Sequence, residues 1–258
     1  MGIKALERAL KVLRCFDALA PEWGVTELSL RTGFEKSHIS KILREFTLAG
    51  LLVQDPATRR YRIGAAAMAL GSGYMARSTF ARIGRRYLHD LASVTGLTAT
   101  LAAFETDGVF YLMSVEGRFG VTARWPVGSR LNLHSTASGK IFAAFVESAR
   151  AADLLARPTL PKATRSTIRS PDVLRRELAR VRRDGYAEEA GENTSDLGAM
   201  AVPVYGADAD IVGALSLLYR YSPHGRDECR QYLPALRETA KQYGRDLADP
   251  TTAAQRGL

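Results

Sequence analysis

Residues 34–46 read FEKSHISKILREF, and two stripes of side chains run along this short segment. The apolar stripe has the i, i+3, i+4, i+7 spacing of one helix face, and it consists of Ile39, Ile42, Leu43 and Phe46. The polar stripe has the same spacing, contains no acid, and consists of Ser37, Ser40, Lys41 and Arg44. The first stripe predicts burial in a core, whereas a stripe of hydrogen-bond donors is either solvated or faces a partner.

The flanking sequence predicts two helices before this segment and a hairpin after it. The first helix is expected over 3–19. Its inward stripe is expected to be Leu6, Leu10 and Leu13, widened by Val12, Phe16 and Leu19. The second helix is expected to begin at Thr26, as N-cap, and to stop at Gly33. LLVQ and RYRI then surround an Asp-Pro turn at 55–56, which favours a two-stranded ribbon. This order is typical of a helix-turn-helix followed by a basic hairpin.

Such a module suits a DNA duplex. A recognition helix fits the major groove and presents Ser, Lys and Arg to base edges, while a basic hairpin displaces counterions along the backbone. We expect the helix face to read sequence and the hairpin arginines to position the module. At the helix start, Lys36 and His38 are placed to reach a phosphate, or His38 simply caps or fills the turn. The predicted DNA-binding residues are Thr26, Lys36, Ser37, His38, Ser40, Lys41, Arg44, Arg59, Arg60 and Arg62.

The composition agrees with a polyanionic partner. The chain has 258 residues, a hydrophobic fraction of 46%, a charged fraction of 24% and a net charge of +9. Residues 1–77 hold 12 Lys and Arg against 7 Asp and Glu, more than half of the basic excess. Two cysteines form no disulfide framework, and neither a signal peptide nor a membrane span is expected. We therefore expect a cytoplasmic protein with no membrane partner.

The rest of the chain predicts an α+β domain with an antiparallel sheet. Strands are expected over 98–105, 109–117, 121–127, 199–205 and 211–219. Helices are expected over 80–95, 137–145, 171–184 and 226–247. The predicted divisions are a DNA-binding module at 1–64, a linker helix at 65–77, a second domain at 78–250 and a tail at 251–258.

One helix start in the second domain resembles a ligand site. Thr136 can cap this helix, and the residues TASGK at 136–140 are small or flexible. Small side chains expose backbone N–H groups, and the helix dipole favours a carboxylate there. The alternative is a tightly packed helix start without a ligand.

Together, these segments resemble the IclR family of bacterial transcription regulators. The resemblance lies in IKALERALKVLRCFD, in VTELSLRTGFEKSHISKILREFTLAGLLVQDPATRRYRIG, in LNLHSTASGKIFAAF and in the distal pattern VRRDGYAEE, AMAVPVY and IVGALSL. It covers about residues 4–247. It implies a winged helix-turn-helix, a linker helix and a C-terminal GAF-like effector domain that binds a small metabolite.

The resemblance also implies the residues of the effector site. Helix-start positions fall on Ala137 and Ser138, flanked by Thr136 and Gly139, and an acidic position falls on Glu189. The family's cysteine position holds Ala199, and its two serine positions hold Ser216 and Leu218. The predicted effector-binding residues are Thr136, Ala137, Ser138, Gly139, Glu189, Ala199, Ser216 and Leu218. Because two polar positions are apolar here, we expect an aromatic or aliphatic acid larger than a short keto acid.

Other functions are weighed against this one. A hydrolase-like enzyme would need a nucleophile motif, but no G-x-S-x-G or H-E-x-x-H occurs and the four histidines are scattered. His134 beside Ser135 is interpreted as structural or as part of a pocket rim. A module that contacts RNA or a protein would favour exposed aromatics, and the hairpin offers one tyrosine, Tyr61. We expect no catalytic residues, no metal and no cofactor.

A single recognition helix reads too few base pairs for a genome-scale search, so a homodimer on a palindromic operator is expected. The linker helix offers Met68, Leu70, Tyr74 and Met75 as a dimer surface, or these residues pack within one chain. The resemblance implies dimers or dimers of dimers, and repression more often than activation. Effector binding is expected to change operator affinity through residues 65–96.

Overall fold

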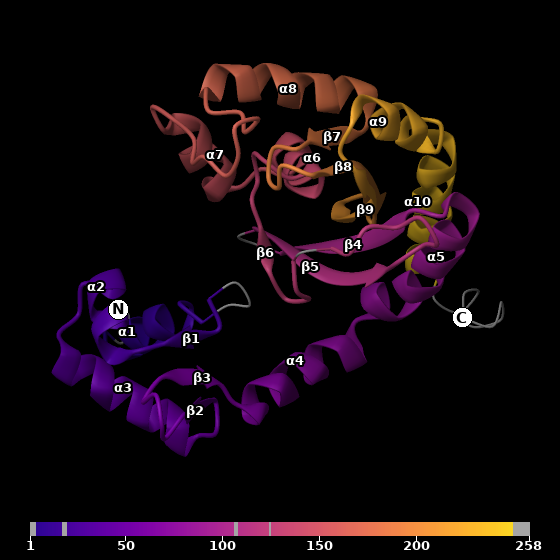
Figure 1. Ribbon diagram of the computed structural model, residues 1–258. Coiled ribbons are helices and arrows are strands. Elements are labelled where there is room, and N and C mark those ends of the chain that lie inside the picture. The colour runs from indigo at the N-terminus through magenta and orange to yellow at the C-terminus, as the bar shows by residue number, and fades with distance from the viewer. Residues whose placement is uncertain (1–3, 17–19, 106–107, 124, 250–258) are drawn as a thin grey trace. The chain divides into compact units, whose positions relative to one another are not determined.

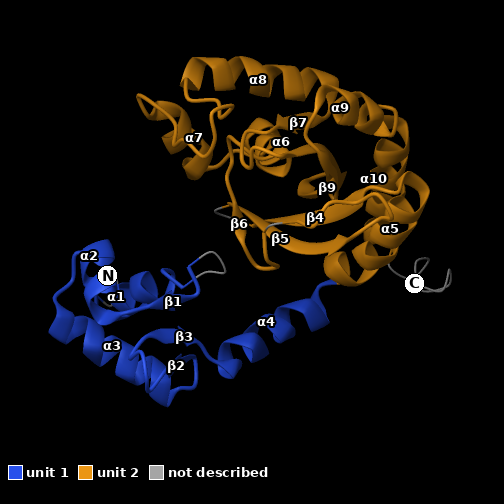
Figure 2. Ribbon diagram, in the orientation of Figure 1, with its two compact units in different colours: residues 1–78 blue, residues 79–258 orange. Residues whose placement is uncertain are grey.

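The computed structural model describes residues 4–16, 20–105, 108–123 and 125–249, which form two compact units. Unit 1 comprises residues 1–78 and unit 2 comprises residues 79–258 (Figure 2). The expected tail at 251–258 lies outside the described residues, as does part of the turn at Asp107.

Unit 1 is a winged helix-turn-helix followed by a linker helix (Figure 1). Its described helices are α1 (Lys4–Leu13), α2 (Val25–Thr32), α3 (Lys36–Leu48) and α4 (Ala65–Arg77). Its described strands are β1 (Glu22–Trp23), β2 (Leu52–Gln54) and β3 (Tyr61–Ile63), which pair antiparallel in the order β1-β3-β2. The expected hairpin is therefore present as β2 and β3, and β1 adds a third strand that the sequence did not indicate.

The core of unit 1 confirms the apolar stripe of α3. Ile39 and Leu43 are fully buried, and Ile42 and Phe46 pack against the same cluster. Burial of each large apolar side chain contributes about 1.5–3 kcal/mol. The expected inward stripe of the first helix is confirmed in part. Val12 and Phe16 are buried and Leu13 packs against the same cluster, but Leu6 and Leu10 are 53% and 44% exposed, so the stripe is wrong at these two positions. Leu19 lies outside the described residues.

The start of α2 also differs from the expectation. Its N-cap is Gly24, and the exposed Thr26 lies one residue inside the helix. The Gly24 N–H donates to the Glu27 carboxylate at 2.9 Å, so the side chain three residues after the N-cap supplies the cap. The helix does end at Gly33, which has a φ of 76° and can adopt this left-handed conformation without strain.

Unit 2 is built on a six-stranded antiparallel sheet. Its strands are β4 (Thr98–Glu105), β5 (Gly108–Val115), β6 (Arg130–Leu131), β7 (Ala187–Ala190), β8 (Leu197–Tyr205) and β9 (Ile211–Arg220), in the order β6-β5-β4-β9-β8-β7. Its described helices are α5 (Thr79–Thr95), α6 (Ala137–Phe145), α7 (Ala149–Ala156), α8 (Pro171–Asp184), α9 (Pro223–Arg230) and α10 (Leu233–Ala248). Mixed helices and antiparallel strands confirm the α+β, GAF-like architecture.

The helices form layers on the two faces of this sheet (Figure 1). α5 and α10 pack together on one face, where they contact β4 and β8. α6 packs on the opposite face against β5, β7, β8 and β9, and α8 covers it from outside. Residues 137–144 of α6 are all buried, so the start of this helix faces the sheet and not solvent.

The elements of unit 2 differ from the expectation in three places. The described residues of 121–127 form no strand, and the edge strand is the short β6 at Arg130–Leu131. Residues 187–190 form β7, which was not expected. The last helix is two helices, because Ser222 and Pro223 start α9 and a proline in the first turn starts α10.

None of the helices in the described part of the chain has the length and apolar character needed to cross a membrane.

Candidate functional site

The polar face of α3 is open to solvent. The side chains of Ser37, Ser40, Lys41 and Arg44 are exposed, and Lys36 is exposed at the helix start. The Arg44 side chain is 73% exposed, and among the described residues its ion-pair partner is its neighbour Glu45, at 3.2 Å. An exposed ion pair of this kind contributes little to stability, so the guanidinium is free to exchange it for another anion. The fold thus buries one stripe of α3 and leaves the stripe of donors outside.

His38 has a different position from its neighbours. Its ring is half-buried and meets the Phe34 ring edge to face, with ring centroids 6.1 Å apart. The ring thus packs in the turn between α2 and α3, while its Nε2 atom has no hydrogen-bond partner among the described residues.

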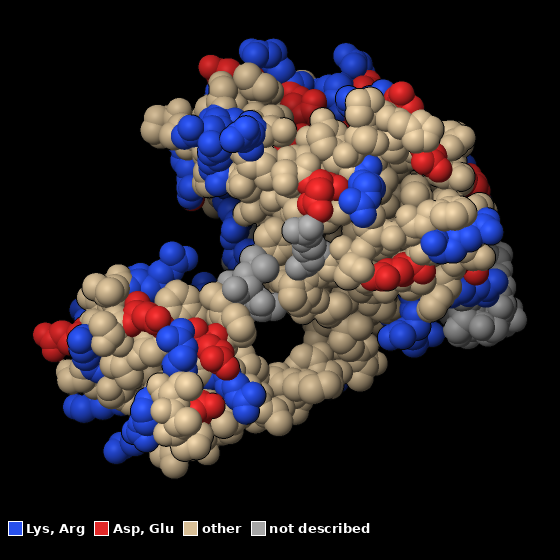
Figure 3. All heavy atoms as spheres, in the orientation of Figure 1, with Lys and Arg blue, Asp and Glu red and all other residues tan. Residues whose placement is uncertain are grey.

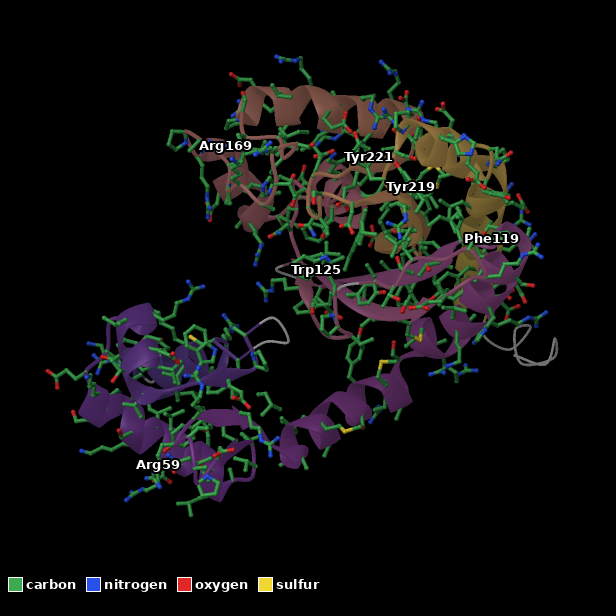
Figure 4. All side chains as sticks on the ribbon, viewed as in Figure 1. Arg59, Phe119, Trp125, Arg169, Tyr219 and Tyr221 are labelled. Carbon is green, nitrogen blue, oxygen red and sulfur yellow. The ribbon has the colours of Figure 1, made fainter. Side chains whose placement is uncertain are left out.

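The wing is the hairpin formed by β2, β3 and the turn between them. Its arginines differ in exposure and in their contacts. The Asp55 carboxylate accepts hydrogen bonds from the Ala57 and Thr58 N–H groups, both at 2.8 Å, and these bonds hold its pKa below the usual value. Arg59 follows in a left-handed conformation with a φ of 59°, and Figure 4 shows it at the outer end of the β2–β3 hairpin. Arg59 and Arg62 are exposed, so both can reach a phosphate.

Arg60 is half-exposed and is engaged by acidic and backbone groups of unit 1. Its guanidinium donates to both oxygens of the Glu27 carboxylate, at 3.1 and 2.9 Å, and to the Glu22 carbonyl at 3.0 Å. In the view of Figure 3, Lys and Arg side chains project from the edges of unit 1 with acidic side chains between them. Arg60 is one of the basic residues already committed to such an acid.

A second candidate site lies between the start of α6 and the sheet of unit 2. A cavity of about 50 Å³ opens there. It is lined by Thr100, Tyr111, Ala123, Trp125, Leu131, Thr136, Ala137, Ser138, Glu189, Thr194, Leu197, Gly198, Ala199, Ser216 and Leu218. The structure thus brings together seven of the eight residues that the sequence singled out for an effector. We call this cavity the effector pocket.

The floor of the effector pocket consists of two cross-strand rows. Directly paired residues in antiparallel strands point to the same face of a sheet. One row runs Glu189, Ala199, Leu218 through β7, β8 and β9, and it is apolar apart from its acidic end. The other runs Ser216, Thr100 through β9 and β4, and it is polar. An amphipathic ligand matches this floor.

The polar row continues onto the start of α6. The Ser138 and Ser216 hydroxyls share a hydrogen bond of 3.0 Å. Thr136 is the N-cap of α6, as expected, and its hydroxyl accepts a hydrogen bond from the Gly139 N–H at 3.0 Å. The positive end of the helix dipole and these hydroxyls together favour an anionic group at this end of the pocket.

Gly139 does not line the cavity. It packs against the segment before α6, where a Cβ atom would come within 2.1 Å of the Asn132 carbonyl oxygen. Its role is to let two stretches of backbone approach closely. Lys140 also points away from the pocket. Its ammonium group is buried and donates to Glu192 at 2.6 Å and to the Glu188 carbonyl at 2.8 Å, which fixes the loop after β7.

Glu189 is the buried acid of the pocket. Its side chain is 7% exposed, and one carboxyl oxygen accepts a hydrogen bond from the Asn193 N–H at 3.0 Å. Burial disfavours the charged form and raises the pKa of Glu189 to about 8. At neutral pH the carboxyl is therefore protonated, and it can donate a hydrogen bond to a carboxylate ligand.

His134 is structural. Its Nε2 atom lies 2.8 Å from the Pro161 carbonyl oxygen, and burial lowers the pKa of its ring. It is absent from the pocket lining, and its interaction with Pro161 secures the segment before α6.

Sequence reasoning missed the pocket residues contributed by the other strands and by the β5–β6 connection. Thr100, Tyr111, Trp125 and Leu131 belong to no motif, and Figure 4 shows Trp125 beside the β5–β6 edge of the sheet. Only the pairing of distant strands brings them to the start of α6. Alternation along the strands could have selected Thr100 for one sheet face, but not the ligand.

A DNA-reading winged helix-turn-helix joined to a domain with a small-molecule pocket defines a ligand-responsive transcription regulator. Two family models match the chain: the IclR helix-turn-helix domain over residues 5–56, and the C-terminal domain of the bacterial transcriptional regulator IclR over residues 73–245. The chain belongs to the IclR family.

Individual relatives agree with this assignment. The chain is 29% identical over 248 residues to the HTH-type transcriptional regulator XynR of Escherichia coli, covering 96% of this chain and 98% of the relative. A crystal structure of an IclR regulator from Silicibacter matches with a TM-score of 0.83 at 28% identity, covering 95% and 96% of the two chains. An IclR homologue of Microbacterium hydrocarbonoxydans, solved with 4-hydroxybenzoate, shares the fold with a TM-score of 0.71 at 23% identity, covering 94% and 98%.

Proposed function

We propose that this IclR-family regulator is a repressor that binds a palindromic operator as a homodimer and responds to a carboxylic acid in the effector pocket. The observation that supports the acid is the buried Glu189 carboxyl in one cavity with the Ser138 and Ser216 hydroxyls at the start of α6, where burial raises the pKa of Glu189 to about 8 and favours its neutral form. One of the two serine hydroxyls donates to the other, so the second serine and the neutral form of Glu189 offer donors to a ligand, and the helix dipole adds positive potential.

The DNA contacts are proposed to divide by role. Ser37, Ser40, Lys41 and Arg44, which we call the reading face, enter the major groove and contact base edges. Lys36, Arg59 and Arg62 contact phosphates, and the exposed Thr26 is placed to do the same. His38 and Arg60 support these contacts from within unit 1, because both side chains are engaged there.

The homodimer is supported by the linker helix. Within the protomer α4 buries none of its residues, and Met68, Leu70 and Tyr74 are 76%, 70% and 43% exposed. Exposed apolar side chains on a helix that one chain leaves in water are suitable contacts for a second copy. Effector binding is then proposed to act through residues 65–96 on the operator affinity of the paired modules.

The effector is proposed to be an aromatic or aliphatic acid and not a short keto acid. Ala199 and Leu218 give the floor of the pocket an apolar row where a short polar acid would leave its oxygens unpaired. The cavity of about 50 Å³ is smaller than the roughly 150 Å³ of a cavity that holds benzene. An aromatic acid therefore requires lining side chains to move outward, and the half-buried Trp125 is one candidate among them. A ligand of this class, 4-hydroxybenzoate, occupies the structure of the Microbacterium homologue.

The relatives are named as transcription regulators, which supports a non-catalytic role in the cytoplasm, where the chromosome is. Titration calorimetry of the full-length protein with benzoates, medium-chain fatty acids, glyoxylate and pyruvate tests the effector class. We expect an aromatic or aliphatic acid to bind most tightly, and gel shifts on operator DNA to weaken when it is added. Tighter binding of glyoxylate or pyruvate than of every larger acid would contradict the proposal.

A further inference from the structure

The hydroxyl group of Tyr111 has no hydrogen-bond partner among the residues that the structure describes. Tyr111 lies on β5, lines the cavity and is 5% exposed, and its hydroxyl oxygen is buried and unpaired. The Ser114 hydroxyl is close by, but the two make no hydrogen bond of standard geometry. Burial raises the pKa of the phenol, so the hydroxyl keeps its proton at neutral pH. Buried polar groups are almost always paired, so an unpaired one in a cavity indicates a missing partner.

The backbone holds Tyr111 in place on both sides. Its N–H donates to the Ser129 carbonyl at 2.9 Å, and its own carbonyl accepts from the Gly128 N–H at 2.8 Å. On the other edge of β5, Tyr111 pairs with Ala102 of β4. A residue fixed by both neighbouring segments cannot turn toward solvent at low cost, so its hydroxyl needs a partner that enters the cavity.

Tyr111 lies two strands away from Ser216, one of the acid-binding donors. Ser216 is on β9 and Tyr111 is on β5, with β4 between them, so about 10 Å separates the two strands across the sheet. Along β4, the partner of Tyr111 lies two residues beyond Thr100, the partner of Ser216. A ligand whose carboxylate is at Ser138 and Ser216 therefore extends past Thr100 toward Tyr111.

We propose that the Tyr111 hydroxyl is a specificity determinant that hydrogen-bonds a second oxygen of the effector, a hydroxyl or carbonyl group remote from its carboxylate. This inference rests on the proposed carboxylic-acid effector. A site built to bond an oxygen discriminates against the analogue that lacks it, because the buried group of the protein is then left unpaired. The effector is accordingly a hydroxy acid or a keto acid with an apolar middle.

Matched ligand pairs test this role. The probes are 4-hydroxybenzoate against benzoate and 4-hydroxybutyrate against butyrate, titrated into full-length wild-type protein and Tyr111→Phe. For at least one pair we expect wild type to bind the oxygenated member about tenfold more tightly. In Tyr111→Phe this preference should disappear, and the affinity for the unoxygenated member should stay unchanged.

A ligand-free measurement supplies the control. Tyr243 is a buried tyrosine outside the pocket, and its hydroxyl donates to the Phe80 carbonyl. Tyr243→Phe removes a made hydrogen bond and should lower the melting temperature, whereas Tyr111→Phe removes an unpaired hydroxyl and should keep or raise it. The proposal is overturned if Tyr111→Phe is destabilised like Tyr243→Phe, or if it weakens both members of each pair equally. If no acid binds wild type at all, the carboxylic-acid effector fails, and the role of Tyr111 fails with it.

Discussion

Arg60 of the wing and Glu27 of α2 form a bidentate ion pair, in which the guanidinium donates two hydrogen bonds of 3.1 and 2.9 Å to the carboxylate. The same carboxylate accepts from the Gly24 N–H, and these two contacts hold the pKa of Glu27 below its usual value. Glu27 thus caps α2 and holds β3 against it. An arginine that the sequence suggests as a DNA contact acts here as a brace for the wing.

The brace predicts different results for adjacent arginines. Arg59→Ala removes one exposed cation, so operator and nonspecific affinity should fall together and the salt slope should flatten by about 1. Arg60→Ala should instead loosen the wing, lower the melting temperature and weaken operator binding. Fluorescence anisotropy over a salt series, together with thermal denaturation, measures both.

Glu27→Gln is the matched control for the brace, because it removes the acid and leaves every basic residue in place. It should reproduce the melting behaviour of Arg60→Ala. If Glu27→Gln tightened DNA binding with an unchanged melting temperature, Arg60 would be an ordinary phosphate contact masked by an acid.

Glu189 predicts a pH dependence of effector binding. Its folded-state pKa of about 8 lies above the ordinary value of 4.5, so the side chain is neutral below pH 8 and anionic above it. A carboxylate ligand binds the neutral form, so affinity should fall as the pH rises from 7 to 9. Titration of wild type and Glu189→Gln across this range should show the decline only in wild type. An equal decline in both would assign the effect to another group.

The raised pKa of Glu189 also makes the stability of the ligand-free protein depend on pH. A group whose pKa is raised on folding contributes stability below its unfolded pKa and loses it as the pH rises through the folded pKa. As the pH rises from about 4.5 to about 8, the melting temperature of wild type should therefore fall relative to that of Glu189→Gln. Parallel melting curves for the two proteins would contradict the raised pKa.

Ala199 and Leu218 predict an exchange of effector class. Both lie in the apolar row of the pocket floor, next to Glu189. The double variant Ala199→Cys, Leu218→Ser returns the polar groups that the family resemblance implies at these positions. It should bind glyoxylate or pyruvate roughly tenfold or more tightly than wild type does, because each new hydrogen bond contributes about 0.5–1.5 kcal/mol. Unchanged affinity for short acids would show that these positions do not set the class.

Local signals predicted much of the fold. The two stripes of α3, the Thr136 cap of α6, and the helix over 171–184 are all confirmed. These features depend on residues a few positions apart. The cap of α2 escaped prediction because Gly24 has no side chain and borrows the carboxylate of Glu27.

The effector pocket could be predicted only in part. The start of α6 and the positions on β7, β8 and β9 follow from the family resemblance. Tyr111, Thr100 and Trp125 enter through strand pairing and loop packing, which one sequence does not reveal. The raised pKa of Glu189 likewise depends on burial in the folded protein. Gly139 lies outside the pocket lining because it packs closely against Asn132.

The central claim is that the reading face of α3 recognises the operator sequence. Fluorescence anisotropy should compare wild type with the Lys41→Ala, Arg44→Ala double variant on an operator duplex, selected by wild type from genomic fragments, and on a scrambled duplex. In the double variant we expect the ratio of operator affinity to scrambled-duplex affinity to fall about a hundredfold or more, since each base contact contributes roughly 1–3 kcal/mol of discrimination. Circular dichroism and acid binding should stay unchanged. An unaltered ratio in a folded double variant would contradict sequence reading by α3.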